Sequence, residues 1–481
     1  MLKAATHHAP EWTPDSQFRI AEVIAGLSAA LDLAEGQPPG HAARTCLIGM
    51  RIAGELKLEA AECEELYYSL LLKDLGGSTN AAKICYLFGT DDRRVKSDLK
   101  AVDWSRMSQT VQFLRRTVMP DGAPLQRVLH AAVFALEGSG GPKKISQMRC
   151  EAGADFARRL GFSRGTAEAI RNLDERWDGR GYPAGLKAEE IPLSGRIASL
   201  AQTIDAFLRI GGPGAAVTIA QERRGSWFDP AVVDAFLALS QEAAFWHGIT
   251  GSEPWAEAAR IEPDVQTFSA DGAALDRIAR IFAEVVDTKS PWTWRHSEGV
   301  AQIAVGIAKV LGLSEETLSR IHRAGLLHDL GKLGVSNLIL DKPGNLTSEE
   351  YVELRRHPEF THQILGSITA FHDIAEMAAT HHERLDGRGY HRGIPAVDLP
   401  IESRLLVVAD ICEALSARRP YRDAMPHERV HEILSKDAGT AVCPECVEAL
   451  KTYHDQNDII NRVNDQLNQV DQVLASVAHH S

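Results

Sequence analysis

Apolar residues recur at helical spacing in several parts of this 481-residue chain. After His296, apolar side chains at positions 300, 303, 304, 307 and 311 fall on the same helical face as that histidine. Another helix is predicted around Leu275–Val286. The apolar run Leu405–Val408 is too short to show helical spacing, so its periodicity would also allow a strand. The pattern thus predicts two helices and leaves the third segment open.

An apolar stripe also runs through the last residues of the chain. Its members follow 3-4-3-4-3 spacing, with asparagine, aspartate and glutamine at most sites between them: Ile460, Val463, Leu467, Val470, Leu474 and Val477. The stripe predicts an amphipathic helix over residues 456–481. This helix could fold back on its own domain or pair with a second chain, so a homodimer is one expected assembly.

The first half of the chain repeats the second. Residues 175–182 and 383–390 differ only at 177 and 385, at an offset of 208, whereas residues 72–76 and 327–331 differ only at 73 and 328, at an offset of 255. The two offsets imply an insertion of about 47 residues in the first copy, which we place near residues 89–141. We therefore expect a first domain over residues 15–245, a linker over 246–271, where Gly, Pro, Ser and Glu are mixed, and a second domain over 272–455.

The candidate chemistry centres on residues 326–332, where His328 and Asp329 stand side by side at the end of an apolar helical segment. A carboxylate can bridge two metal ions while the adjacent imidazole holds one of them. Lys332 follows about one helical turn later and can face the same pocket. We therefore expect Asp329 and Lys332 to be catalytic residues.

Further potential ligands occur before and after this pair. A single histidine is more often a surface or core residue than a ligand, but an ordered set is a stronger signal. The remaining members are His296, His357, His381, His382 and Asp410.

About 160 residues, from near His296 to near Val447, resemble the HD-GYP family of metal-dependent phosphodiesterases. The resemblance runs through residues 328–332, 340–347, 381–390 and 416–422. It implies an all-α fold of two tandem HD-domain-like helical bundles, with Leu405–Val408 in a helix. It also implies that Asp329 bridges two divalent metals. One ion would be completed by His296, His328 and Asp410, and the other by His357, His381 and His382.

The resemblance favours iron or manganese, and the ligand set is also compatible with zinc or nickel. The expected reaction is hydrolysis of cyclic di-GMP to the linear dinucleotide by a metal-activated water, with further cleavage to GMP left open. Two alternatives remain. The chain could be a non-catalytic nucleotide-sensing or protein-interaction module, or it could hydrolyse another nucleotide, such as a mixed cyclic dinucleotide.

Several residues are expected to contact substrate because they match family positions. Lys332 would reach one phosphate, and Arg419 and Arg422 the others. Gly387, Gly389 and Tyr390 belong to the signature loop.

The chain departs from the family pattern at three positions. His391 replaces the signature proline, and Glu413 stands where many relatives carry aspartate. Some relatives bind a third metal through a glutamate at the position of Trp292, which offers no ligand here, so we expect two metals and not three.

The first copy keeps only two of the seven ligand positions, His41 and Asp74. The other five positions hold Lys73, Arg149, Leu173, Asp174 and Gln202. Because lysine and arginine would place positive charge where metals should lie, we expect a degenerate domain without a dinuclear centre. Its expected role is regulation or contact with an unknown signalling protein.

Composition and charge indicate which partners and which cellular compartment to expect. The net charge of −13 argues against DNA or RNA as a partner. The sequence shows neither a signal peptide nor an apolar run long enough to span a bilayer, so we expect a cytoplasmic protein without membrane attachment. Seven scattered cysteines suit a reducing compartment. Cys443 and Cys446 are interpreted as packing residues at a helix start.

Overall fold

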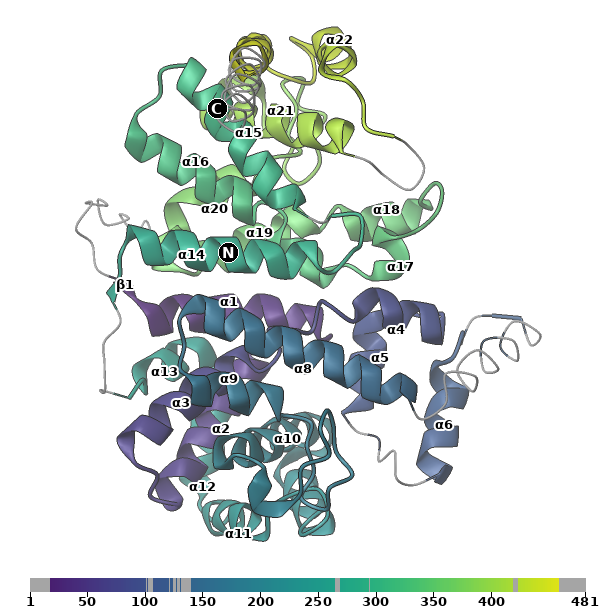
Figure 1. The fold of residues 1–481 in the computed structure, drawn as a ribbon, viewed down its shortest axis with the longest axis vertical. Helices are drawn as coiled ribbons and strands as arrows, with labels where there is room; N and C mark the ends of the chain where they lie inside the picture. Colours follow the sequence, from purple (N-terminus) through teal and green to yellow (C-terminus); the bar gives the residue numbers. More distant parts are fainter. Residues whose placement is uncertain are drawn as a thin grey trace, which may run out of the picture.

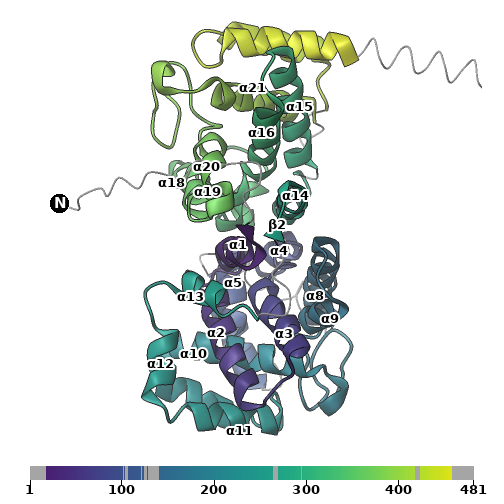
Figure 2. The same cartoon turned by 90° about the vertical axis from the view of Figure 1, so that its left-hand side faces the viewer.

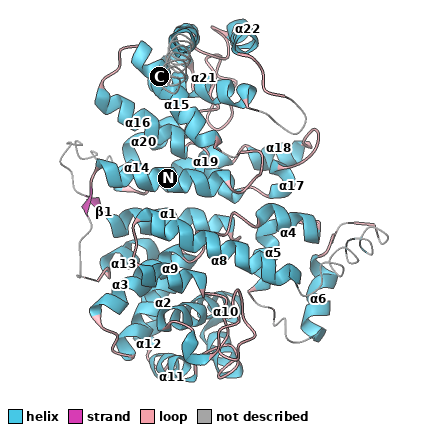
Figure 3. Cartoon of the chain, viewed as in Figure 1, coloured by secondary structure: helices cyan, strands magenta, loops and turns pink. Residues whose placement is uncertain are grey.

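The computed structural model describes residues 18–100, 102, 107–120, 122–123, 127, 130, 140–263, 269–293, 295–417 and 423–457. Helices form nearly all of the regular structure in these residues (Figure 3). The exception is an antiparallel pair of two-residue strands, β1 (Phe18–Arg19) and β2 (Ser269–Ala270). The all-α prediction is therefore confirmed. The C-terminal helix expected over residues 456–481 lies outside the described residues except at 456–457, which belong to a helical stretch that begins at 444.

The first domain is a bundle of helices around α1 and α2. Its elements in chain order are α1 (Ile20–Ala34), α2 (His41–Glu55), α3 (Ala60–Leu72), α4 (Ala81–Phe88), α5 (Asp92–Leu99), α6 (Met107–Thr117), α8 (Gly140–Leu160), α9 (Arg164–Arg171), α10 (Leu193–Glu222), α11 (Pro230–Leu239), α12 (Ala243–Ile249) and α13 (Pro254–Arg260). The described part of the expected insertion contains α5 and α6. These two helices extend from one side of the bundle (Figure 1).

The second domain lies beyond the first along the long axis of the molecule (Figure 1). Its main elements are α14 (Gly272–Asp287), α15 (His296–Val310), α16 (Glu315–Leu327), the 3-10 helix η2 (Leu330–Gly334), α17 (Asn337–Leu340), α18 (Ser348–Leu354), α19 (His357–Gly366), α20 (His372–Ala379), α21 (Ile401–Ser416) and α22 (His427–Asp437). The ambiguous run Leu405–Val408 lies inside α21 and is buried. It is therefore a helical segment, as the family resemblance implied. No helix among the described residues is long and apolar enough to cross a membrane.

Much of the segment for which a linker was expected, residues 246–271, is folded. It contains the end of α12, all of α13 and strand β2. Helix α13 packs against α1 and α2, and the Tyr67 hydroxyl donates a hydrogen bond to the Ala258 carbonyl at 2.9 Å. Pro254 at the first turn favours the helix start, but seven residues are too few to show a periodic apolar pattern.

The two domains share one continuous hydrophobic core. Helix α1 packs against η2 and α19 of the second domain, and Figure 2 shows α1 at this boundary. At Gly26 the helix approaches Ile368 so closely that a Cβ atom would clash with that side chain. The interface also buries an ion pair, because Lys289 Nζ donates to Asp92 Oδ2 at 3.1 Å and both side chains are almost fully buried. The domains are therefore joined by apolar and charged contacts.

Candidate metal centre

The seven expected ligands come together in the second domain. His296 begins α15, His328 ends α16 and His357 begins α19, whereas Asp410 lies within α21. Potential ligand atoms lie within 4.8 Å of one another in each of three overlapping groups: His357, His381 and His382; His296, His328 and Asp410; His328, Asp329 and His381. All groups of this kind found among the described residues belong to this domain.

Asp329 lies between two sets of imidazoles. Its Oδ2 atom is 3.5 Å from His296 Nε2 and 3.3 Å from His328 Nε2. Its Oδ1 atom is 3.5 Å from His357 Nε2 and 3.6 Å from His381 Nε2. One carboxylate oxygen thus faces each set, which is the arrangement that a bridging ligand requires.

Asp410 and His382 complete the two sets. Asp410 Oδ1 lies 3.4 Å from His296 Nε2 and 3.8 Å from His328 Nε2. The ring of His382 packs against that of His381, with centroids 4.1 Å apart. The grouping matches the one that the family resemblance implied.

Backbone contacts fix the orientation of three of the imidazoles. The Nδ1 atoms of His328, His357 and His381 lie 2.7, 2.7 and 2.6 Å from the carbonyl oxygen three residues earlier in each case. A carbonyl can only accept a hydrogen bond, so each Nδ1 carries the proton. The lone pair of each Nε2 therefore remains available for a metal.

Two buried atoms in this cluster have no hydrogen-bond partner among the described residues, namely His328 Nε2 and Asp329 Oδ1. Buried polar atoms in folded proteins are nearly always hydrogen-bonded, because leaving one unsatisfied costs about 1–3 kcal/mol. Coordination of metal ions would satisfy both atoms. The cluster therefore fits the metals that the sequence predicts.

The protonation states also suit ligation. Burial lowers the pKa of His357 to about 3 and that of His382 to about 4. Burial, together with the neighbouring imidazoles, holds the pKa of His381 well below its usual range. These three rings are therefore neutral at pH 7, the form that binds a metal. Despite burial, the neighbouring carboxylates raise the pKa values of His296 and His328, so a metal would displace a proton from these two rings.

Glu413 supports the centre from behind His296. Its Oε2 atom accepts a hydrogen bond from His296 Nδ1. Burial alone would lower the pKa of His296, but hydrogen bonds to Asp329, Asp410 and Glu413 raise it well above its usual range. The first copy has the same arrangement, with His41 Nδ1 2.7 Å from Asp205 Oδ2.

In the sequence Glu413 stands out only as a departure from aspartate, because its offset of 208 from Asp205 pairs the two carboxylates without showing what either one contacts. Gly299 makes room for the longer side chain, because a Cβ atom there would lie 2.9 Å from Glu413 Cγ. Where the first copy has the shorter aspartate, the position equivalent to Gly299 is Arg44, whose Nε donates to Asp205 at 2.6 Å.

Asp287 also helps to position His296, and the sequence did not predict this role. Asp287, at the end of α14, accepts hydrogen bonds from the Ser297 amide at 3.1 Å and hydroxyl at 2.8 Å. This contact fixes the start of α15 and so the position of His296. Burial raises the pKa of Asp287 to about 6. In the first copy Asp32 accepts from the Ala42 amide in the same way, at 2.9 Å.

Lys332 and Tyr390 of the expected substrate site lie beside the ligands. Lys332 Nζ donates to Asp329 Oδ2, and the Tyr390 ring stacks on His382 with centroids 4.4 Å apart. The guanidinium of Arg355 lies 5.0 Å from the centre of the Tyr390 ring. Arg355 belongs to no motif, so its place beside Tyr390 could not be predicted from the sequence. Arg419 and Arg422 lie outside the described residues.

Glu383 holds the signature loop in place. Its carboxylate accepts hydrogen bonds from the three backbone amides of residues 392–394 at 2.9, 3.3 and 3.1 Å. Gly389 is required for close approach, since a Cβ atom there would lie 2.5 Å from Glu383 Cα. Gly387 has a φ of +69° and His391 a φ of +111°. A β-carbon makes such angles costly, so His391 holds a strained backbone conformation.

The equivalent place in the first copy holds cations. Lys73 Nζ donates to Asp74 Oδ2, and Arg149 Nη1 donates to Asp74 Oδ1 at 3.2 Å. Lys100 adds a third cation, with its Nζ 3.3 Å from His41 Nε2. The sequence predicted positive charge from Lys73 and Arg149 at this place, but not their contacts with Asp74. Lys100 was not predicted, because the insertion that carries this residue has no counterpart in the second copy.

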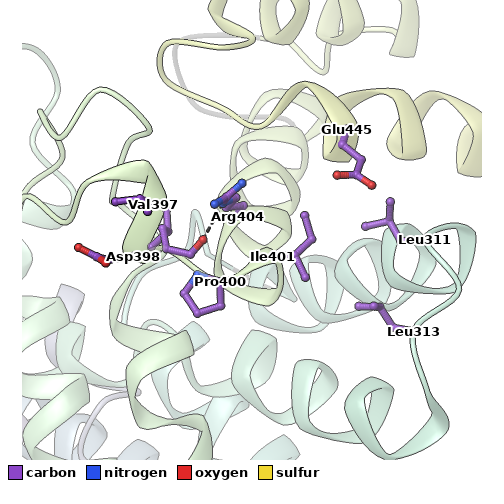
Figure 4. A pocket seen from close by; sticks show the side chains of 9 residues that line it. Leu311, Leu313, Val397, Asp398, Pro400, Ile401, Arg404 and Glu445 are labelled. Atoms are coloured by element: carbon purple, nitrogen blue, oxygen red, sulfur yellow. Dashed lines mark hydrogen bonds between the residues drawn. The ribbon is translucent and has the colours of Figure 1, made fainter.

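A surface hollow of about 530 Å³ lies elsewhere in the second domain, where the loop after α15 approaches the start of α21 (Figure 4). Leu311, Leu313, Ile401 and Glu445 line it, and Arg404 crosses it to donate to the Leu399 carbonyl at 2.6 Å. None of the seven clustered ligands lines this hollow. It is therefore separate from the candidate metal centre.

Comparisons with known proteins place this geometry in a family. The model of the HD domain matches residues 143–232 and 280–445, and so parts of both copies. The chain is 41% identical over 434 residues to "3'3'-cGAMP-specific phosphodiesterase 3" of Vibrio cholerae, covering 90% of this chain and 94% of that protein. It is 38% identical over 177 residues to a "Cyclic di-GMP phosphodiesterase" of Thermotoga maritima, covering 36% of this chain and 48% of that protein.

A solved structure gives the same result over nearly the full length. The crystal structure of a cyclic GMP-AMP-specific phosphodiesterase from V. cholerae superposes with a TM-score of 0.64 at 36% sequence identity, covering 92% of this chain and 98% of that one. The likeness therefore includes both copies and their arrangement. The matched family model, the full-length relative and the His-Asp cluster agree: this chain belongs to the HD-domain family, as an HD-GYP-type phosphodiesterase.

Proposed function

We propose that the second domain hydrolyses a cyclic dinucleotide, with 3'3'-cGAMP as the preferred substrate. The observation that carries the reaction type is the position of Asp329, with one carboxylate oxygen facing each of two sets of ligands. Two adjacent cations suit phosphodiester hydrolysis, because they can stabilise both the attacking and the leaving oxygen.

The seven clustered residues would hold two divalent metals, with Asp329 shared between them. When bound, the metals would lower the pKa of a water nucleophile and polarise the phosphorus centre. Iron and manganese are favoured by the family, and zinc and nickel suit the same ligands. Trp292 offers no ligand, so no third metal is proposed.

The neighbouring side chains would bind and orient the substrate. Lys332 supplies a positive charge at the edge of the cluster, where it can contact a phosphate oxygen. Burial raises the pKa of Tyr390 above its usual range, so its hydroxyl stays protonated and can donate a hydrogen bond. Gly387 and Gly389 let the loop backbone run close to the ligand, and Arg419 and Arg422 would contact the remaining phosphate.

The preferred substrate differs from the cyclic di-GMP that the family resemblance favoured. The full-length V. cholerae relative is named as 3'3'-cGAMP-specific, and the relatives named for cyclic di-GMP match only part of this chain. The two cyclic dinucleotides carry the same two phosphates and differ in one base. The proposed preference therefore depends on contacts to that base and not on the metal centre.

Chromatography of products from an equimolar mixture of 3'3'-cGAMP and cyclic di-GMP tests both parts of the proposal. We expect linear product from both, with 3'3'-cGAMP consumed at least about tenfold faster, a preference of about 1.4 kcal/mol. Asp329→Ala should form no product, whereas Asp373→Ala, a surface change in the same domain, should be as active as wild type. Faster loss of cyclic di-GMP would contradict the substrate, and failure to hydrolyse either compound would contradict the reaction.

A further inference from the structure

A cavity of about 410 Å³ lies in the first domain at the position that corresponds to the metal centre of the second. Four of the five residues that replace metal ligands line it: Arg149, Leu173, Asp174 and Gln202. Loss of the ligands has therefore not closed the site. A cavity remains where the metals would have been.

The cavity is more basic than the rest of the molecule. Five basic and three acidic side chains line it, although the whole chain carries a net charge of −13. Arg149 is balanced by Asp74 and Asp174 within the described residues. Lys100, whose Nζ lies 3.8 Å from Asp74 Oδ1, shares this carboxylate with Arg149. Arg180, at the exposed rim, adds further positive charge. The field in the cavity thus favours an anion.

Several polar atoms of the lining are buried and make no hydrogen bond to any described residue. The uncharged ones are Gln202 Oε1, Trp227 Nε1 and Asn80 Oδ1. Gln202 is only 9% exposed and occupies the position of the metal ligand Asp410. One donor and two acceptors are therefore available to a ligand that carries both kinds of group, as the edge of a purine base does.

The remaining walls are apolar or aromatic, with Ile84, Phe88, Leu99, Ile145 and Tyr182 among them. Apolar walls with a few convergent polar groups are typical of small-molecule sites, whose volumes run from roughly 300 to 1,000 Å³. A cavity near the lower end of that range suits a mononucleotide better than a cyclic dinucleotide, which has about twice as many atoms.

From these features we infer that the first domain binds a purine nucleoside monophosphate in this cavity. The phosphate lies toward Lys100 and Arg180, and the base contacts Gln202 and Trp227. This is a second ligand site, separate from the proposed hydrolytic centre. It gives the degenerate copy a chemical role that does not need metals.

Helix α5 connects this cavity with the second domain, so binding should be measured on the full chain. Lys96 of α5 lines the cavity and lies 3.5 Å from Asp92 of the same helix. Asp92 in turn accepts hydrogen bonds from the Asn337 amide at 3.0 Å and from Lys289 at 3.1 Å.

Equilibrium dialysis with radiolabelled GMP and AMP tests the inference. All samples carry Asp329→Ala, which removes the metal-dependent site and makes the result independent of hydrolysis. We expect saturable binding of one of the two nucleotides, at one molecule per chain. Arg180→Glu and Lys100→Met should each weaken it at least about tenfold, because each removes a positive charge that would contact the phosphate. Arg164→Glu, an equivalent change at a residue whose side chain is 92% exposed on α9, should leave binding unchanged.

Three results would overturn the inference. The first is no saturable binding of either nucleotide up to about 1 mM, which corresponds to about 4 kcal/mol. The second is binding that neither cavity substitution weakens. The third is displacement by equal concentrations of inorganic phosphate or of 3'3'-cGAMP, which would show that the cavity selects a simple anion or a larger nucleotide.

Discussion

The buried ion pair between Asp92 and Lys289 joins the two domains, and its removal should weaken the whole molecule. Asp92 is fully buried and Lys289 is 1% exposed. Asp92→Asn keeps the shape of the side chain and an acceptor for the Asn337 amide. It removes the negative charge that Lys289 needs in a nonpolar environment. The change therefore isolates the electrostatic part of the contact.

We expect Asp92→Asn to lower the free energy of unfolding by about 3–5 kcal/mol, the usual cost of leaving one partner of a buried pair uncompensated. Replacing both partners, in Asp92→Asn with Lys289→Met, should recover most of that loss, because Lys289 no longer leaves an unpaired charge and Lys96, 3.5 Å from Asp92, keeps Glu35 at 3.6 Å. Asp91→Asn, at a half-buried neighbour that contacts Arg93, is the matched control and should change stability by less than about 1 kcal/mol.

Urea unfolding followed by circular dichroism and tryptophan fluorescence measures these differences, and coincident transitions would establish that the shared core unfolds as one unit. The reasoning would be refuted if Asp92→Asn were as stable as wild type. It would also be refuted if the double variant were no more stable than the single one.

The pair also predicts a dependence on pH. Burial alone would raise the pKa of Asp92, but Lys289, Lys96 and the Asn337 amide hold it well below its usual range. A carboxyl whose folded-state pKa is lowered contributes stability above its unfolded pKa of about 4 and loses that contribution as the pH falls further. The gap in stability between wild type and Asp92→Asn should therefore shrink as the pH falls below about 4.

Three further changes test the surroundings of the centre. Glu413→Ala should lower metal affinity about 10- to 100-fold in a chelator competition, because His296 loses the carboxylate that orients it; unchanged affinity would contradict this role. Glu383→Ala should lower kcat about 10- to 100-fold at unchanged metal content, since it frees the loop that carries Tyr390; full activity would show that the loop holds its shape without it. His391→Gly should stabilise the protein by about 1 kcal/mol in urea unfolding, because glycine adopts a positive φ without strain, whereas His391→Pro should destabilise it; the opposite order would refute the strain argument.

The candidate centre could be predicted from sequence because its ligands lie in recognisable motifs. His328 and Asp329 are adjacent in the sequence. The repeat also allowed each expected ligand to be compared with the residue at the same position of the first copy. That comparison also identified Lys73 and Arg149 as cations at the degenerate site. The structure adds how the centre is built, with one oxygen of Asp329 facing each set of imidazoles.

Contacts between distant segments could not be predicted. Asp92 and Lys289 are separated by 197 positions, and neither lies in a motif. Lys100 reaches His41 from an insertion that has no second copy for comparison. The contact of Glu413 with His296 depends on space left by Gly299, and such space becomes visible only when α15 and α21 are packed together.

Helix α13 was missed for a different reason. Its seven residues span two turns, so the apolar pattern is too short to distinguish a helix from a linker. Packing against α1 and α2 stabilises α13. Such tertiary contacts cannot be recognised from the residues of the helix alone.

The metal content of protein purified without oxygen is the most direct test of the proposed centre. We expect two metals per chain in the wild type, because one set of ligands faces each oxygen of Asp329. We also expect loss of metal in Asp329→Ala and no loss in Asp74→Asn, a change at the corresponding position of the first domain. Three well-occupied metals per chain, or two that remain after Asp329→Ala, would contradict a dinuclear centre at Asp329.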